Sequence, residues 1–158
     1  MKLLSDSTNV WDLMYDQYGF CPDYTKESYS WIKPPLPFKT FLLPESCWNE
    51  AQEKMVNSFF LKLDLHDLFA LDWQHDCFTY DPAEEIPLYY SYQDDQRQCM
   101  VYFPSYYPNG DYYFFGDAEW KYGLFGHPWL NEIVVTGEEL IRLFEENSQV
   151  LGITAKKQ

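Results

Sequence analysis

Short signatures of enzyme chemistry are missing from this 158-residue chain. It has no G-x-S-x-G nucleophile elbow, no cysteine-protease signature and no glycine-rich phosphate loop, so nucleophilic and nucleotide chemistry lack a motif. Its three histidines do not show the short H-E-x-x-H spacing, and its four cysteines form no C-x-x-C pair. We therefore predict no bound metal and no cofactor.

Targeting and membrane signals are also absent. The first residues, Met-Lys-Leu-Leu-Ser-Asp-Ser, contain no apolar core of a signal peptide. No apolar run approaches the roughly 20 residues that span a bilayer. We expect a cytoplasmic protein with reduced thiols and no membrane partner.

Positive charge is scarce. The chain has 11 Lys and Arg against 25 Asp and Glu, a formal net charge of −14. Such a field repels nucleic acid and anionic membranes and attracts basic proteins. The predicted partner is therefore a basic protein, although acidity also serves solubility alone.

Aromatic residues, by contrast, are abundant. They make up 20% of the chain within a hydrophobic fraction of 46%, which argues for a folded protein despite the charge. A chain of this length buries roughly 70% of its unfolded surface in one domain. We predict a single domain over residues 1–158, with residues 1–7 and 148–158 loosely ordered.

Helical patterns occur near both ends. Ser7 or Thr8 can cap a helix that ends near Tyr18, and an apolar face predicts a second helix over 46–61. Residues 62–71 either continue that helix or form another short one. Thr136 and Glu139 have the spacing of a capping box and predict a C-terminal helix. Prolines predict an extended arm over 20–37.

Strand patterns fill the middle of the chain. The predicted strands are 38–43, 73–80, 86–92, 97–104, 111–116, 121–125 and 131–135. The order of elements indicates an α+β fold with a mainly antiparallel sheet of about five strands. N-terminal helices and a C-terminal helix would pack on one face of this sheet.

Three motifs in this order resemble a known family. They are ALDWQH at 70–75, YPNGDYY at 107–113 and GHPW at 126–129, and the segment 10–15 and the GEEL at 137–140 fit the same pattern. Together they are similar to small bacterial proteins known only as a domain of unknown function. The resemblance implies a bacterial single-domain protein and carries no activity with it.

Asp72, His75 and Asp76 are candidate catalytic residues because they stand among many apolar side chains. In an extended segment His75 would point away from both aspartates, whereas in a helical one Asp72 and His75 would be neighbours. Such a pair either transfers protons or simply holds the structure together.

Two loops contribute further candidates. Gly126 and Pro128 predict a rigid loop that presents His127 and Trp129, where His127 is a catalytic or binding candidate. A tyrosine-rich loop follows the strand 97–104, and tyrosines are common in recognition surfaces. The predicted binding residues are Tyr106, Tyr107, Asp111, Tyr112, Asp117, His127 and Trp129.

Three functions fit these observations. The first is a protein-binding module without catalysis, an immunity protein or inhibitor that neutralises a basic toxin or nuclease. The second is a small hydrolase that uses His75 or His127 with a nearby aspartate, and it requires these groups to converge on one pocket. The third is a small-ligand or carbohydrate-binding domain with an exposed aromatic platform.

Overall fold

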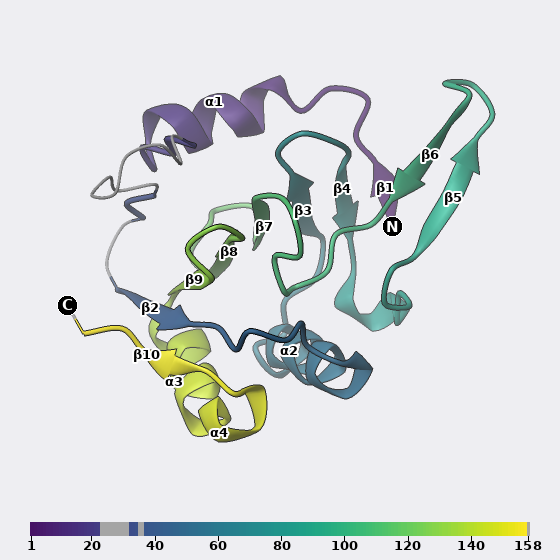
Figure 1. The fold of residues 1–158 in the computed structure, drawn as a ribbon. Helices are drawn as coiled ribbons and strands as arrows, with labels where there is room; N and C mark the ends of the chain where they lie inside the picture. The colour runs from purple at the N-terminus through teal and green to yellow at the C-terminus, as the bar shows by residue number, and fades with distance from the viewer. Residues whose placement is uncertain (23–31, 35–36, 158) are drawn as a thin grey trace.

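The computed structural model describes residues 1–22, 32–34 and 37–157. Its elements are β1 (Lys2–Leu3), α1 (Thr8–Asp16), β2 (Phe38–Leu42), α2 (Glu50–Lys62), β3 (Leu68–Asp72), β4 (Cys77–Tyr80), the 3-10 helix η1 (Pro82–Glu84), β5 (Ser91–Asp94), β6 (Cys99–Tyr102), β7 (Tyr113–Gly116), β8 (Gly123–His127), β9 (Glu132–Thr136), α3 (Glu138–Glu146), α4 (Ser148–Leu151) and β10 (Thr154–Ala155). The predicted α+β class is confirmed (Figure 1).

The predicted antiparallel sheet is confirmed, but its size is larger than predicted. Eight strands form one sheet in the order β1-β4-β3-β7-β8-β9-β2-β10, and β5 and β6 form a separate hairpin. Every neighbouring pair is antiparallel. The expectation of about five strands was wrong because it missed β3 and the two short strands at the sheet edges.

Helices cover both faces of the sheet, not one face as predicted. In Figure 1, α1 lies on one side of the strands, and α2, α3 and α4 lie on the other. Neighbouring strand residues alternate between two cores: Phe114 packs on the α1 side and Phe115 on the α2 side. This alternation follows from the two-residue period of a strand.

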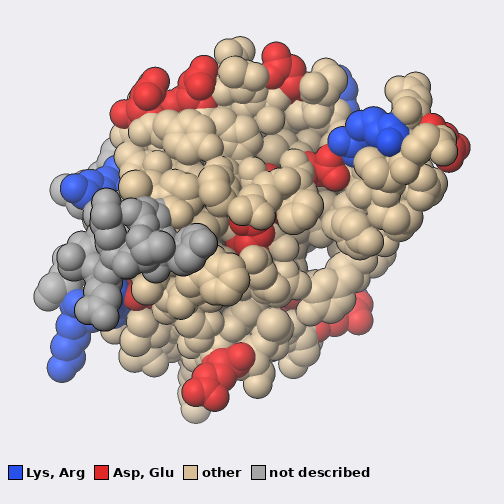
Figure 2. Space-filling model, turned by 45° about the horizontal axis from the view of Figure 1, so that its top comes forward, with Lys and Arg blue, Asp and Glu red and all other residues tan. Residues whose placement is uncertain are grey.

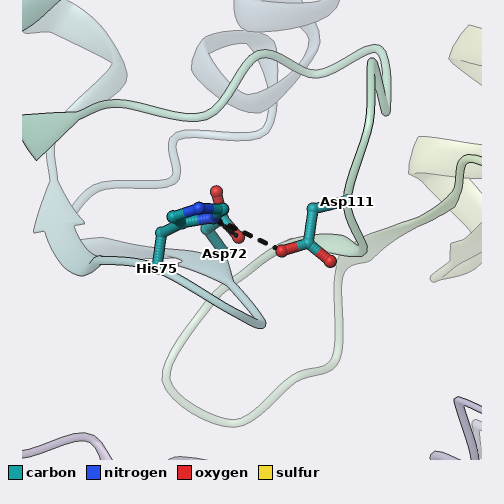
Figure 3. Close-up of side chains that lie close together, drawn as sticks. All are labelled: Asp72, His75 and Asp111. Carbon is teal, nitrogen blue, oxygen red and sulfur yellow. Dashed lines mark hydrogen bonds and ion pairs between the residues drawn. The ribbon is translucent and has the colours of Figure 1, made fainter.

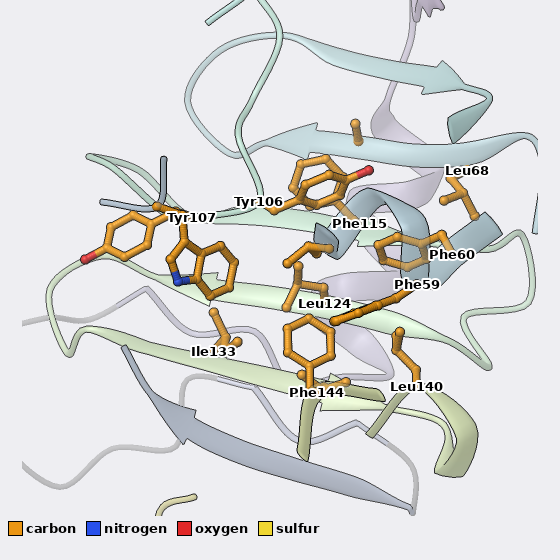
Figure 4. Packing of buried hydrophobic residues seen from close by; sticks show 14 of the residues in the cluster. Phe59, Phe60, Leu68, Tyr106, Tyr107, Phe115, Leu124, Ile133, Leu140 and Phe144 are labelled. Atoms are coloured by element: carbon orange, nitrogen blue, oxygen red, sulfur yellow. The ribbon is translucent and has the colours of Figure 1, made fainter. Parts of the chain in front are cut away.

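The larger core joins α2 and α3 to the sheet. Phe144 of α3 meets Phe59 edge-on at a centroid distance of 5.2 Å, and both side chains are fully buried. Figure 4 shows this pair beside Leu124 and Ile133 of the sheet. None of the helices described is long and apolar enough to cross a bilayer.

Both chain ends pair in the sheet, where the sequence predicted loose ends. Lys2 and Leu3 align with Thr79 and Phe78, while Thr154 and Ala155 align with β2. The fully buried Leu151 anchors the C-terminal segment, and its carbonyl accepts a 2.8 Å hydrogen bond from the Trp48 indole. Loose order of residues 1–7 and 148–158 stays a prediction, and this pairing and the burial of Leu151 are the contacts that oppose it.

Two further predictions of local structure were wrong. Residues 62–71 do not continue the helix, because Asp64 and Asp67 take left-handed backbone angles and Leu68 starts β3. Thr136 and Glu139 form no capping box: Thr136 ends β9, and Glu139 accepts a hydrogen bond from the Tyr122 hydroxyl. The predicted arm over 20–37 lies partly outside the described residues.

The burial of the C-terminal segment can be tested by a pair of neighbouring substitutions. We expect Leu151→Ala to lower the free energy of unfolding by about 2 to 5 kcal/mol, because it leaves a cavity in the core. Val150 is 57% exposed, so Val150→Ala should change stability by less than about 0.5 kcal/mol. Urea denaturation of both variants measures this difference. Equally small changes in the free energy of unfolding would show that the C-terminal segment frays.

Candidate functional site

A tight turn between β3 and β4 brings Asp72 and His75 together. The amide of Asp72 donates to the carbonyl of Asp76 at 3.2 Å, so the strand predicted over 73–80 begins only at Cys77. Within this turn, Nδ1 of His75 lies 3.1 Å from Oδ1 of Asp72. The segment is neither the extended strand nor the helix considered from sequence, but the turn makes Asp72 and His75 neighbours, as the helical alternative would have.

Asp111 joins this pair from a distant part of the chain. Its Oδ2 lies 3.5 Å from Nδ1 of His75 and accepts a 3.0 Å hydrogen bond from the amide of Gln74. Its Oδ1 accepts from the amide of Tyr112 at 2.7 Å. Figure 3 shows the two carboxylates converging on the imidazole. We call Asp72, His75 and Asp111 the Asp–His–Asp centre.

The electrostatics of the centre follow from unequal burial. Both aspartates are buried, whereas the His75 side chain is 60% exposed. Burial, with Asp111 alongside, raises the pKa of Asp72 to about 7. Partial burial opposes charging of His75, but Asp72 and the other nearby carboxylates outweigh it and raise its pKa. The centre can thus hold a proton or a cation.

The other histidine and aspartate candidates are not part of this centre, although Asp76 lies in the same turn. Asp76 forms an ion pair of 2.8 Å with Arg97. His127 is fully buried, its Nδ1 accepts from the amide of Leu130 at 3.1 Å, and burial lowers its pKa to about 4. His127 is thus a neutral interior residue at neutral pH. Asp117 accepts from the amide of Tyr122 at 2.7 Å and supports the β7–β8 turn.

The three tyrosines predicted as surface anchors are buried in the structure. Tyr106, Tyr107 and Tyr112 are 7%, 5% and 1% exposed. The Tyr106 hydroxyl donates to Oδ1 of Asn57 at 2.7 Å, and that of Tyr107 donates to the carbonyl of Pro44 at 2.7 Å. Their rings therefore serve packing, because apolar area and satisfied hydroxyls favour the interior. Trp129, at 64%, is exposed as predicted.

A cleft that the sequence did not predict lies beside α2. It has a volume of about 440 Å³ and is bounded by one face of α2, by residues 80–89 and by residues 103–106. Its charged lining consists of Glu50, Glu53, Lys54, Asp81 and Glu85. Because these positions are distant in sequence, no local pattern could reveal the cleft. We call it the α2 cleft.

Glu53 is the buried acid of the α2 cleft. Its two carboxylate oxygens accept from the amides of Tyr106 and Tyr107 at 2.8 and 2.9 Å, and only 7% of the residue is exposed. Burial raises its pKa to about 7, although the two amides oppose this shift. The sequence contained one signal of this burial. Glu53 precedes Val56 and Phe60 by three and seven positions, so the helical period places it on the same buried face of α2.

Comparisons with known proteins give a family but no activity. The family described as "Protein of unknown function (DUF2716)" matches residues 4–141. A relative named "Uncharacterized protein YxiI", from Bacillus subtilis (strain 168), is 31% identical over 133 residues, which cover 76% of this chain and 77% of the relative. No solved structure gives a significant match.

The buried carboxylate of Glu53 predicts a dependence of stability on pH. Its pKa is raised above the ordinary value of 4.5 to about 7. The folded state is therefore favoured below the ordinary pKa, and this advantage is lost as pH rises through about 7. From the shift we expect a loss of about 3 kcal/mol at most. Urea denaturation of the wild type and Glu53→Gln between about pH 5 and about pH 8.5 measures it.

The informative quantity is the difference between the two proteins, since other groups also titrate. Glu53→Gln should be the less stable protein at low pH. The side-chain NH2 group of the glutamine cannot accept a hydrogen bond, so it would face one of the two backbone N–H groups as a second donor. It should recover relative to the wild type as pH rises. Glu50→Gln, on the same helix but exposed, should follow the wild type. A constant difference between wild type and Glu53→Gln would contradict the raised pKa.

Proposed function

The chain belongs to the DUF2716 family of proteins of unknown function, and we propose that it is an acidic protein-binding domain that captures a basic partner in the α2 cleft. In the finer form of this proposal, it is a cytoplasmic immunity protein or inhibitor that neutralises a basic toxin or nuclease. The membership confirms the resemblance to an uncharacterised bacterial family.

The charge of the α2 cleft is the observation that supports this proposal. Four carboxylates line the cleft against one lysine, and that lysine is 2.8 Å from Glu50. Asp81 contacts the exposed His66, whereas Glu85 is exposed and forms no ion pair with another described residue. The lining therefore keeps a negative charge that a cation of a partner can compensate.

The apolar part of the lining suits a long basic side chain. Tyr89 is 59% exposed and Leu61 38% exposed, and both line the cleft. Lysine and arginine carry an apolar stem that packs on such surfaces while the charged end stays near carboxylates. A tyrosine ring also attracts a cation over its face. A lysine or arginine on an extended segment of the partner matches both features.

The field of the whole protein supports the same choice of partner. Acidic side chains are spread over the face shown in Figure 2, where basic ones are fewer. The formal net charge is −14. Such a field speeds the encounter with a positively charged protein and slows it with an acidic one. An antidote benefits from this, because it must bind before the toxin acts.

The alternatives have less support in the described residues. The hydrolase alternative required a histidine and aspartates to converge on a pocket; His75 does converge with Asp72 and Asp111, but none of the three lines the α2 cleft. The carbohydrate alternative required an exposed aromatic platform; Tyr106, Tyr107 and Tyr112 are buried and cannot belong to it, whereas Tyr89 and Trp129 are exposed. We therefore base the proposal on the cleft.

A matched pair of charge reversals tests the role of the cleft. The partner is first isolated from the native cell at low salt, and the proposal requires it to be basic and stoichiometric. We expect Glu85→Lys to raise the dissociation constant of this partner about tenfold, because it removes a rim carboxylate and adds a cation. Isothermal titration calorimetry at two salt concentrations measures the change.

Asp16→Lys is the control. Asp16 is exposed on α1, on the opposite side of the sheet from α2, and the substitution makes the same change in charge. It should weaken binding only through the general field, by about twofold at low salt and less at high salt. Equal weakening by both variants would show that the field acts without the cleft. A partner that is acidic, or that binds equally well to Glu85→Lys, would contradict the proposal.

A further inference from the structure

The Asp–His–Asp centre has the composition and spacing of a metal site. One imidazole nitrogen and one oxygen from each carboxylate lie within 4.8 Å of one another. They come from two segments, the β3–β4 turn and the loop before β7, that are 36 residues apart between His75 and Asp111. The missing short motif therefore did not exclude a site that the fold assembles.

The two carboxylates of the centre also lie beside His75 without a lysine or arginine partner among the described residues. Asp72 and Asp111 are 5% and 7% exposed, and no lysine or arginine among the described residues forms an ion pair with either. Arg97, which reaches the turn, forms its ion pairs with Asp76 and Asp94 instead. Two buried carboxylates side by side repel each other unless a cation or a proton compensates them.

We propose that Asp72, His75 and Asp111 bind a divalent first-row transition-metal ion, such as zinc or manganese. The mixed set of one imidazole and two carboxylates suits such ions better than calcium, which takes six to eight oxygen ligands. The metal would also clamp the β3–β4 turn to the loop that carries Asp111. This inference goes beyond the proposed binding function and does not depend on it.

The surroundings of the centre favour metal binding in two further ways. Backbone amides of Gln74 and Tyr112 donate to the carboxylates, and such outer contacts orient metal ligands. His75 is 60% exposed, so an ion can enter and water can complete its coordination.

His66 provides a matched control within the same protein. It also lies between two aspartates, with Nδ1 2.8 Å from Asp81 and Nε2 3.5 Å from Asp64. These carboxylates approach opposite nitrogens of the ring, so they cannot share one ion with it. Asp64 is fully exposed, and water compensates its charge.

Zinc titration of the purified full chain tests the proposal. Isothermal titration calorimetry in a reducing buffer without chelators compares the wild type with His75→Ala, Asp111→Asn and His66→Ala. We expect one zinc per chain in the wild type and in His66→Ala, and an affinity lower by at least about tenfold in His75→Ala and Asp111→Asn. His75 is exposed, so His75→Ala keeps the test valid if Asp111→Asn does not fold.

Cobalt absorption gives a second readout, because the exposed Cys21, Cys47 and Cys99 are competing ligands. A thiolate bound to cobalt produces intense charge-transfer absorption in the near ultraviolet, whereas nitrogen and oxygen ligands do not. We expect the spectrum of cobalt bound to the wild type to lack this charge-transfer absorption. We expect no spectrum of bound cobalt in His75→Ala. The proposal is overturned by no stoichiometric binding, by binding that survives in His75→Ala, by equal loss in His66→Ala, or by a thiolate spectrum.

Discussion

Buried carboxylates accept hydrogen bonds from backbone amides and thereby fix the segment between β6 and β7. Both candidate sites depend on this segment. Near its start, Glu53 binds the amides of Tyr106 and Tyr107; at its end, Asp111 binds those of Tyr112 and Gln74. The first contact builds a wall of the α2 cleft, and the second builds the Asp–His–Asp centre. The segment between β6 and β7 has little regular structure, and two acidic residues fix it: Glu53 of α2 and Asp111 of the segment itself.

These contacts have opposing energies. Taking a carboxylate out of water is unfavourable by several kcal/mol, and amide hydrogen bonds return only part of this free energy. The raised pKa of Glu53, to about 7, reflects that remainder. The benefit is that loop amides without strand partners are satisfied in the interior, where an unpaired amide is also unfavourable. The fold therefore exchanges some stability for a defined loop.

The sequence predicted those features that repeat locally. The alternating strands were recognisable, and so was the helix predicted over 46–61, which begins at Glu50 in the structure. An i, i+3 contact between Asp72 and His75 was one of two geometries considered. What failed depended on contacts distant in sequence. The strand register placed Thr136 in β9 instead of at a cap, and Leu151 is buried in a core that also includes residues of α2 and β2. The cleft and the position of Asp111 likewise required the tertiary structure.

The acidic residues divide into two groups with different physical roles. Exposed acids create the long-range field, which salt screens over a distance of about 8 Å at physiological ionic strength. Buried acids such as Glu53 and Asp111 are shielded from salt and act through contacts of 2.7 to 3.0 Å. Net charge alone cannot separate these groups, which is why composition could indicate a basic partner but not its site. Since salt screens mainly the first group, the partner binding that we propose and the loop structure should respond to salt separately.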